Sequence, residues 1–90
     1  MVGYNYLGSR NLMRGTEGTD VELLQRLLNN LPEPIGSRIA IDGIFGPRTE
    51  AAVKKFQGHF NLAADGIVGP NTFLFLGILV RPYLPPGGRV

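Results

Sequence analysis

The residues best suited to chemistry lie in a short motif that the chain contains twice. DGIFGPRT at 42–49 returns 23 residues later as DGIVGPNT at 65–72, with six of eight positions identical. Two carboxylates, Asp42 and Asp65, could form a general acid–base pair or ligate a cation. An aspartate before glycine also bonds its own nearby backbone, while the glycine adopts a positive φ. We therefore predict that both aspartates are turn formers and not a catalytic pair.

Other kinds of reactive site find little support in the sequence. The chain has no cysteine, and its one histidine, His59, lacks a partner at ligand spacing, so we expect a surface residue. An EF-hand register centred on Gly43 would put Arg38 and Ala40 at ligand positions and Thr49 at the glutamate position, which does not fit a calcium loop. No Ser-His-Asp set or phosphate-binding loop is evident. We expect no catalytic residues, no metal, no cofactor and no enzymatic activity.

Three helices are expected to position the two motif copies. Apolar residues recur at helical spacing over 20–31 and 47–60, and a nearly all-apolar stretch follows at 70–79. The intervening residues 35–41 read as a loop. Because the third helix is apolar almost all round, we expect it to pack on more than one side.

Local signals mark where these helices begin and end. Residues 18–20 offer capping oxygens to the first helix, and Pro32 and Pro34 end it. Pro47 and Pro70 suit the first position of the next two helices, since a missing N–H costs nothing there.

Each motif copy is predicted to be a turn, an apolar plug and a helix start. The plugs, which we expect to fold inward, are Ile44 with Phe45 and Ile67 with Val68. Gly46 and Gly69 would then allow a tight approach to the helix, so we expect Gly46→Val to destabilise the domain.

A second repeat lies within the helices. Val21 to Gln25 and Val53 to Gln57 share the pattern V-x-x-[L/F]-Q. We expect both glutamine amides to satisfy loop backbone groups, with direct ligand contact as the alternative.

Composition and charge narrow the class of protein. Ninety residues fit one domain, and nine basic and seven acidic residues give a net charge of +2 without a basic block. The sequence shows no 18-residue apolar run and no charged start followed by an apolar segment, so we expect neither a membrane span nor a secretory signal. Of the 20 Gly and Pro residues, six lie in the two motif copies and five in the last nine residues.

Three motifs in order resemble a known family. G-x-x-G-x-D-V-x-x-L-Q occurs at 15–25, DG-x-FG-x-x-T-x-x-AV-x-x-FQ at 42–57, and DG-x-VG-x-x-T at 65–72. This pattern is similar to the peptidoglycan-binding domain 1 family, found beside bacterial and phage wall hydrolases. The resemblance implies an all-α fold, a compact three-helix bundle. It covers residues 12–79, leaving an N-terminal extension at 1–11 and a Pro/Gly-rich tail at 80–90.

Two departures from the family pattern bear on these expectations. Asn61 stands where members often have glycine, and asparagine tolerates the left-handed conformation of a helix end, so we expect the cap to survive. The connection at 32–41 carries two prolines and is somewhat long. If it borders the ligand groove, ligand preference could differ.

The resemblance also suggests where a wall ligand would bind. Loop amides and carboxylates could meet a peptide stem or sugar hydroxyls, and a cation near a helix start could pair with stem carboxylates. The candidate ligand-binding residues are Asp42, Gly43, Phe45, Arg48, Gln57, Asp65, Gly66 and Asn71. Backbone geometry or solvation is the competing interpretation for most of them. Tyr4, Tyr6 and Tyr83 could stack on sugars or simply pack.

By this resemblance the chain is a non-catalytic module that binds peptidoglycan or muropeptides and targets an associated wall-active protein, such as a hydrolase. A docking or prodomain-like role of the same fold is the alternative. A small DNA-binding helical domain is less favoured, because the stretch at 71–80 contains no Lys or Arg. We expect a monomer in the cell wall or extracellular space, with no nucleic-acid or membrane partner.

Overall fold

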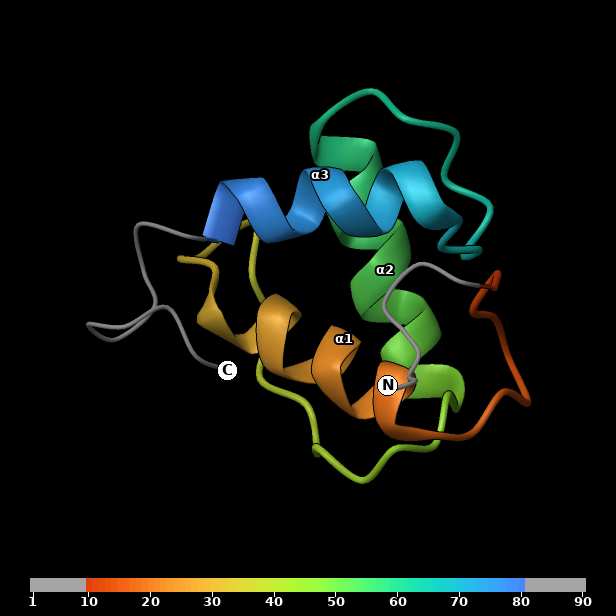
Figure 1. Ribbon diagram of the computed structural model, residues 1–90. Helices are drawn as coiled ribbons and strands as arrows, with labels where there is room; N and C mark the ends of the chain where they lie inside the picture. Colours follow the sequence, from red (N-terminus) through yellow and green to blue (C-terminus); the bar gives the residue numbers. More distant parts are fainter. Residues whose placement is uncertain (1–9, 81–90) are drawn as a thin grey trace.

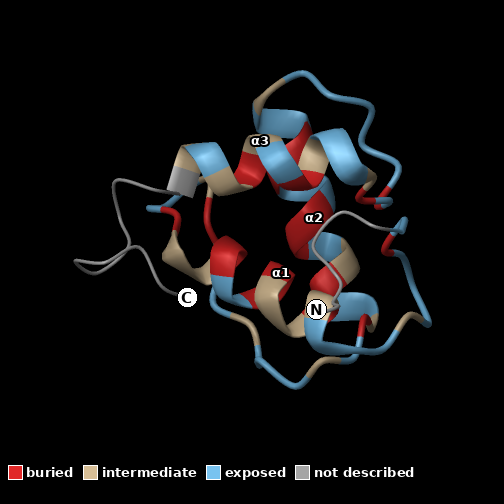
Figure 2. Cartoon of the chain, in the orientation of Figure 1, coloured by how far each residue is buried: buried red, intermediate tan, exposed pale blue. Residues whose placement is uncertain are grey.

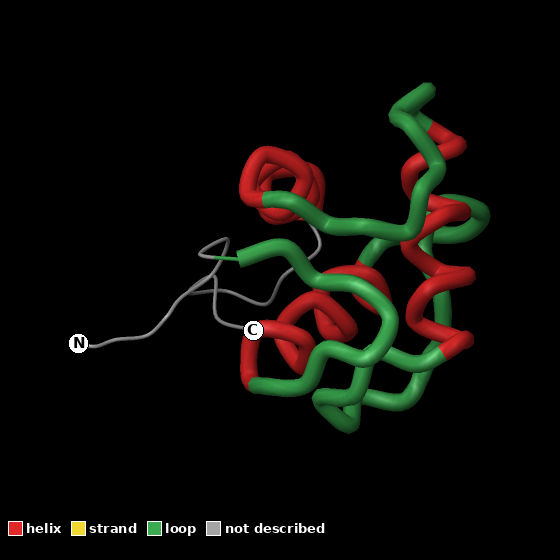
Figure 3. The backbone as a smooth tube through the Cα atoms, turned by 90° about the vertical axis from the view of Figure 1, so that its right-hand side faces the viewer, coloured by secondary structure: helices red, strands yellow, loops and turns green. Residues whose placement is uncertain are grey.

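Three helices make up the regular structure of the protein in a computed structural model that describes residues 10–80 (Figure 1). They are α1 (Thr19–Asn30), α2 (Pro47–His59) and α3 (Pro70–Val80). Over the described residues, β structure is limited to two isolated bridges, and loops connect the helices (Figure 3). The predicted all-α, three-helix fold is confirmed, with helix bounds within about a residue of those expected from periodicity.

The core is built from all three helices together with residues from the loops between them (Figure 2). The predicted apolar stripe of α1 is buried, and Pro47 and Pro70 are the first residues of their helices as expected. The loops contribute Leu12, Phe45 and Val68, each at most 1% exposed. Because a domain this small has a thin core, these loop residues are essential to its closure.

The third helix differs from expectation. Phe73 and Leu76 are buried, but Leu74 and Ile78 are 65% and 66% exposed, so the prediction of packing on more than one side is wrong. Within the described chain, α1 and α2 cover one side of α3 only. No described helix has the length and apolar character needed to cross a membrane.

The start of α1 is held by an ion pair and by one of the expected capping oxygens, since an Asp20 carboxylate oxygen accepts from the N–H of Val21 at 3.0 Å. Gly18 occupies the N-cap position without a side-chain hydrogen bond. The guanidinium of Arg10 donates to both carboxylate oxygens of Asp20, at 2.8 and 3.0 Å, and to the carbonyl of Glu17 at 2.6 Å. This contact lowers the pKa of Asp20, with the hydrogen bond from Arg10 as the largest cause.

The lowered pKa of Asp20 predicts a pH-dependent stability. Because the folded pKa lies below the unfolded value of about 3.9, the stabilisation is complete above that value and is lost as the pH falls through the folded pKa. We expect Arg10→Gln to lower the urea midpoint at pH 6 and to lower it much less at pH 2.5. The exposed Arg26, which pairs with no described acid, provides the control: Arg26→Gln should change neither midpoint. An equal loss at both pH values for Arg10→Gln would contradict the assignment.

The end of α2 confirms the expectation for Asn61. This residue is left-handed, with φ 59°. Its N–H donates to the carbonyl of Gly58 at 3.3 Å, and the N–H of Leu62 donates to the carbonyl of Gln57 at 2.8 Å. These are the paired bonds of a Schellman motif, which satisfies carbonyls that the helix leaves free.

Candidate functional site

Both motif copies fold into the same turn. A carboxylate oxygen of Asp42 accepts from the N–H of Ile44 at 3.0 Å, and Asp65 accepts from Ile67 at 2.9 Å. The glycine after each aspartate has a φ of 75°. The aspartates are therefore the turn formers that the sequence predicts.

A buried glutamine anchors each turn, as the pattern V-x-x-[L/F]-Q suggests. Gln25, 1% exposed, accepts from the N–H groups of Asp42 and Gly43 at 3.0 and 2.9 Å. Its amide nitrogen lies within 3.0 to 3.1 Å of three acceptors, the Asp42 carboxylate, the Ile44 carbonyl and the Thr49 hydroxyl.

Gln57 anchors the second turn in the same way. It accepts from the N–H of Gly66 at 3.0 Å and donates to Asp65 at 3.2 Å and to the Ile67 carbonyl at 2.9 Å. Both amides thus satisfy loop backbone groups, as expected.

The segment before α1 fixes both turns from the other side. Phe45 and Thr16 share a 2.9 Å hydrogen bond, and Leu12 and Val68 exchange two bonds of 2.8 Å. Phe45 and Val68 point into the core as predicted, whereas Ile44, 51% exposed, and Ile67 point outward, so the expectation that both isoleucines are plugs is wrong. Only one apolar residue of each pair fits beneath its turn.

The two glycines of the first motif copy differ in how well each position would accommodate a side chain. Gly43 has a positive φ, and a Cβ there would lie 3.2 Å from the carbonyl oxygen of Gly18. Gly46 has an ordinary φ of −104°, and a Cβ would meet nothing within 4 Å, so the expected sensitivity of Gly46 lacks a steric cause. Its extended conformation is the one that the following proline favours.

We expect Gly43→Ala to lower the free energy of unfolding by about 1–2 kcal/mol, because an L side chain is strained at this φ. Gly46→Ala is the matched control and should cost less, because Gly46 has an ordinary φ with open space for a Cβ and loses only the N-cap preference for glycine over alanine. Urea denaturation of the two variants provides the comparison. Equal losses at both positions would show that the turn is not as described.

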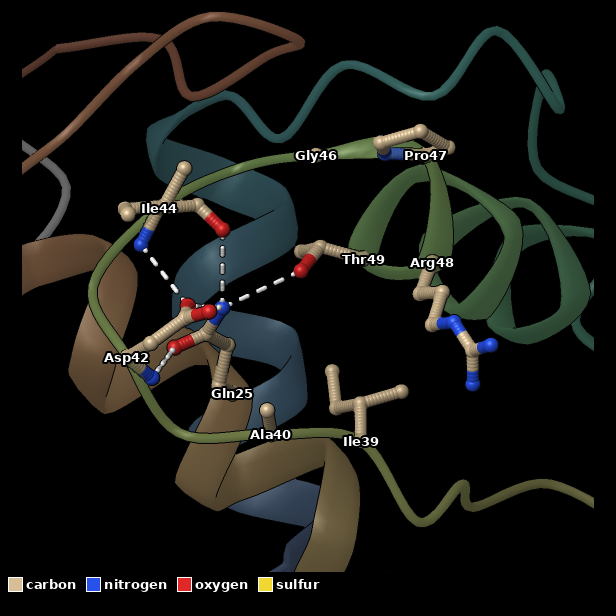
Figure 4. A pocket seen from close by; sticks show the side chains of 9 residues that line it. All are labelled: Gln25, Ile39, Ala40, Asp42, Ile44, Gly46, Pro47, Arg48 and Thr49. Carbon is tan, nitrogen blue, oxygen red and sulfur yellow. Dashed lines mark hydrogen bonds between the residues drawn. The ribbon is translucent and has the colours of Figure 1, made fainter.

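A pocket of about 290 Å³ opens beside the first turn (Figure 4). One wall is the start of α2, and the other is the end of the α1–α2 connection, with the floor formed by the anchoring glutamine. Its lining residues are Gln25, Ile39, Ala40, Asp42, Ile44, Gly46, Pro47, Arg48 and Thr49. A mixed apolar and polar lining with two opposite charges is suited to binding a small polar group.

The wall at 39–40 is fixed by a side chain that the sequence did not single out. Asn29 donates to the carbonyl of Ile39 at 2.8 Å and accepts from its N–H at 3.0 Å. The sequence raised the possibility that this connection borders a groove, but Ile39 and Ala40 carry no motif that would identify them. Their contribution arises from the path of the loop alone.

The predicted site residues do not form one surface. Asp42 and Arg48 line the pocket, and Gly43 lines a shallower hollow on the far side of the turn with Glu17 and Glu22. Three candidates, Phe45, Gln57 and Gly66, are buried, and the remaining two, Asp65 and Asn71, are exposed at the second turn. The structure thus groups the candidates turn by turn. Asp42 lines the pocket with Arg48 and the hollow with Gly43, and Gln57 is hydrogen-bonded to Asp65 and Gly66 in the second turn.

The two charged residues of the pocket, Asp42 and Arg48, form no ion pair with each other. The pKa of Asp42 is lowered by the N–H of Ile44 and by the amide of Gln25, so the carboxylate is ionised at neutral pH. Arg48 is exposed and forms no ion pair with any residue in 10–80. Asp42 is the one carboxylate in the lining, so the pocket does not hold the pair of acids that glycosidic hydrolysis uses.

The remaining candidates give no second site. His59 is an exposed residue of α2, as expected, with its ring edge against Phe60 at 4.9 Å between centroids. Tyr4, Tyr6 and Tyr83 lie outside the described residues. Within 10–80, no three His, Asp or Glu side chains are grouped as metal ligands would be.

Comparison with known proteins agrees with this architecture. A family model described as a putative peptidoglycan binding domain matches residues 17–76. The zinc D-Ala-D-Ala carboxypeptidase of Streptomyces albus G is 48% identical over 68 residues, which are 76% of this chain and 26% of that protein. A probable N-acetylmuramoyl-L-alanine amidase of Bacillus licheniformis is 41% identical over 61 residues, or 68% of this chain and 17% of the amidase.

A solved structure shows the same fold. The peptidoglycan-binding protein from Clostridioides difficile, crystallised with glutamine hydroxamate, superposes with a TM-score of 0.72 at 36% identity. The match covers 87% of this chain and 47% of that one. The chain spans about a quarter or less of the two curated relatives.

Proposed function

Because the chain belongs to the putative peptidoglycan-binding domain family, we propose that it is a non-catalytic module that binds peptidoglycan and holds a wall-active protein at this insoluble polymer. Two of its relatives are named as a zinc D-Ala-D-Ala carboxypeptidase and a probable N-acetylmuramoyl-L-alanine amidase, and this chain matches only a small share of each. Attachment raises the local concentration of a linked domain at its substrate. The module works at the cell wall, with its folded unit at 12–79 and as a monomer.

The pocket beside the first turn is the proposed binding site, and its geometry is the observation that carries the assignment. A hydrogen-bonded frame of Gln25, Asp42 and Thr49 holds the pocket open, while the Arg48 side chain lies at its edge (Figure 4). Preformed pockets bind with less loss of conformational entropy than mobile surfaces do. In this proposal the exposed Asp65 and Asn71 of the second turn make a secondary contact with the polymer.

Co-sedimentation with washed sacculi tests the proposal. The intact chain should pellet with sacculi, and Arg48→Ala should weaken retention roughly 5- to 30-fold, as loss of one charged contact would. Arg26→Gln changes the same net charge away from the pocket and should bind as the parent does. A parent chain that remains in the supernatant would exclude the function, and equal retention of Arg48→Ala would exclude this site.

A further inference from the structure

We propose that the pocket takes the zwitterionic end of a peptide stem, a carbon that carries both a free ammonium and a free carboxylate, such as the distal end of a diamino dicarboxylic acid. The inference rests on the proposed function and specifies which part of the polymer the pocket binds. Its basis is the pair of opposite charges at 42 and 48 and the small, partly apolar space between them.

The arrangement of charge is the first argument. Figure 4 shows Asp42 and Arg48 on opposite sides of the pocket, and no ion pair within 4.0 Å joins them. One oxygen of the Asp42 carboxylate accepts the hydrogen bonds from Ile44 and Gln25 that hold the turn. The other oxygen makes no hydrogen bond with the described residues. A ligand with one cation and one anion offers a partner to each of these charges, and charge-assisted hydrogen bonds are the stronger kind.

The lining between the charges is the second argument. Ile39, Ile44 and Pro47 supply apolar surface, which suits the aliphatic chain of an amino acid. A volume of about 290 Å³ is at the lower end of the range for small-molecule sites and holds a group of about one residue. Neutral sugars would fill the same space, but they would leave both charges without a partner, and so charge favours the stem over the glycan.

The second motif copy has asparagine where the first has arginine. Asn71 occupies the position of Arg48, while Asp65 retains the position and the turn of Asp42. The side chains of Glu50 and Lys54 lie against Gly66, within 3.0 and 3.2 Å of where its Cβ would be. The two turns thus share a frame, and only the first combines it with an exposed arginine beside the pocket.

An NMR titration of the whole chain with four probes tests the inference. They are a stem peptide containing diaminopimelate, the same peptide amidated at the distal carboxylate, the same peptide acetylated at the distal amine, and glycan strands stripped of stems with their lactyl carboxylates amidated so that they are neutral. We expect the unmodified peptide to shift the amides of Ala40, Ile44 and Thr49, and each blocked peptide to bind roughly 5- to 30-fold more weakly.

Two conservative variants assign each charge to its partner. Arg48→Gln should lose the discrimination between free and amidated carboxylate. Asp42→Asn should lose the discrimination between free and acetylated amine, while its side-chain oxygen still accepts from Ile44 and Gln25. Arg26→Gln should keep both preferences.

The inference would be overturned if all three peptides bound equally, or if stripped glycan bound in preference to the stem. Sedimentation with sacculi would in that case still support peptidoglycan binding. Failure to sediment would instead remove the proposed function itself.

Discussion

Replacing Gly36 with alanine should destabilise the domain more than an alanine substitution at any other described glycine. A Cβ at this position would overlap the carbonyl oxygen of Leu31, and it would lie 2.6 Å from the carbonyl carbon of Leu31 and 3.1 Å from the carbonyl oxygen of Leu28. All three atoms are backbone, so no rotamer change relieves the contact. The end of α1 or the α1–α2 connection would have to move.

The connection at Gly36 has little freedom to move. The N–H of Gly36 donates to the carbonyl of Pro32 at 2.8 Å, and Lys55 donates to the Gly36 carbonyl at 2.6 Å. The next N–H, from Ser37, donates to the carbonyl of Leu28 at 3.2 Å. Displacement of this segment would break bonds at the end of α1 and disturb the nearby wall of the pocket.

We expect Gly36→Ala to lose at least about 3 kcal/mol of unfolding free energy, a large fraction of the roughly 5–13 kcal/mol that a domain of this length has. Urea denaturation followed by circular dichroism measures the loss. Gly58→Ala is the matched control, since a Cβ there has open space and alanine favours the helix by up to about 1 kcal/mol. An unchanged midpoint for Gly36→Ala would contradict the described path of residues 31–36.

Replacing Gln25 with leucine should be the second largest effect. The substitution keeps a buried side chain of similar size but removes every bond to the first turn. The N–H groups of Asp42 and Gly43 lose their acceptor, and the Ile44 carbonyl loses a donor. Because a buried polar group without a partner costs about 1–3 kcal/mol, we expect a total loss of about 3 kcal/mol.

Hydrogen exchange distinguishes this mechanism from a general loss of packing. The amide of Gly43 should lose its protection in Gln25→Leu by a larger factor than the amides of the buried core of α2. Retention on sacculi should fall in proportion to the folded protein present and then further, because the turn beside the pocket is no longer anchored.

Gln57→Leu is the matched control for this prediction. It removes the equivalent anchor of the second turn and should also destabilise, yet its folded fraction should keep the pocket and the retention on sacculi. Identical losses of retention in the two variants, after correction for folded protein, would refute the placement of the site at the first turn.

The helices and turns could be predicted from the sequence because the signals that define them are local. The spacing of Val21, Leu24 and Leu28 defines the buried face of α1, and Asp-Gly pairs define turns through their own backbone bonds. Asn61 could be predicted as a left-handed cap for the same reason. The family followed from the order of these motifs, and the match over 17–76 confirms it.

The candidate site was only half predictable, because burial is decided by the neighbours of a residue. The repeat makes Arg48 and Asn71 equivalent, and Phe45 is both a predicted core plug and a predicted ligand contact. Phe45 faces the core because the segment before α1 pairs with its backbone, through Thr16 at 2.9 Å. No local pattern shows that pairing.

By itself, the sequence determined the helix positions, the two glutamine-anchored turns and membership of a wall-binding family. Tertiary structure decided that the first turn has a pocket, because Asn29 holds Ile39 in the wall that faces the start of α2. It also decided that Leu74 and Ile78 face outward, since within the described chain only one side of α3 is covered. The physical reason is the same in both cases: turns and helices form through contacts a few residues apart, whereas a pocket or a buried face depends on segments that folding brings together.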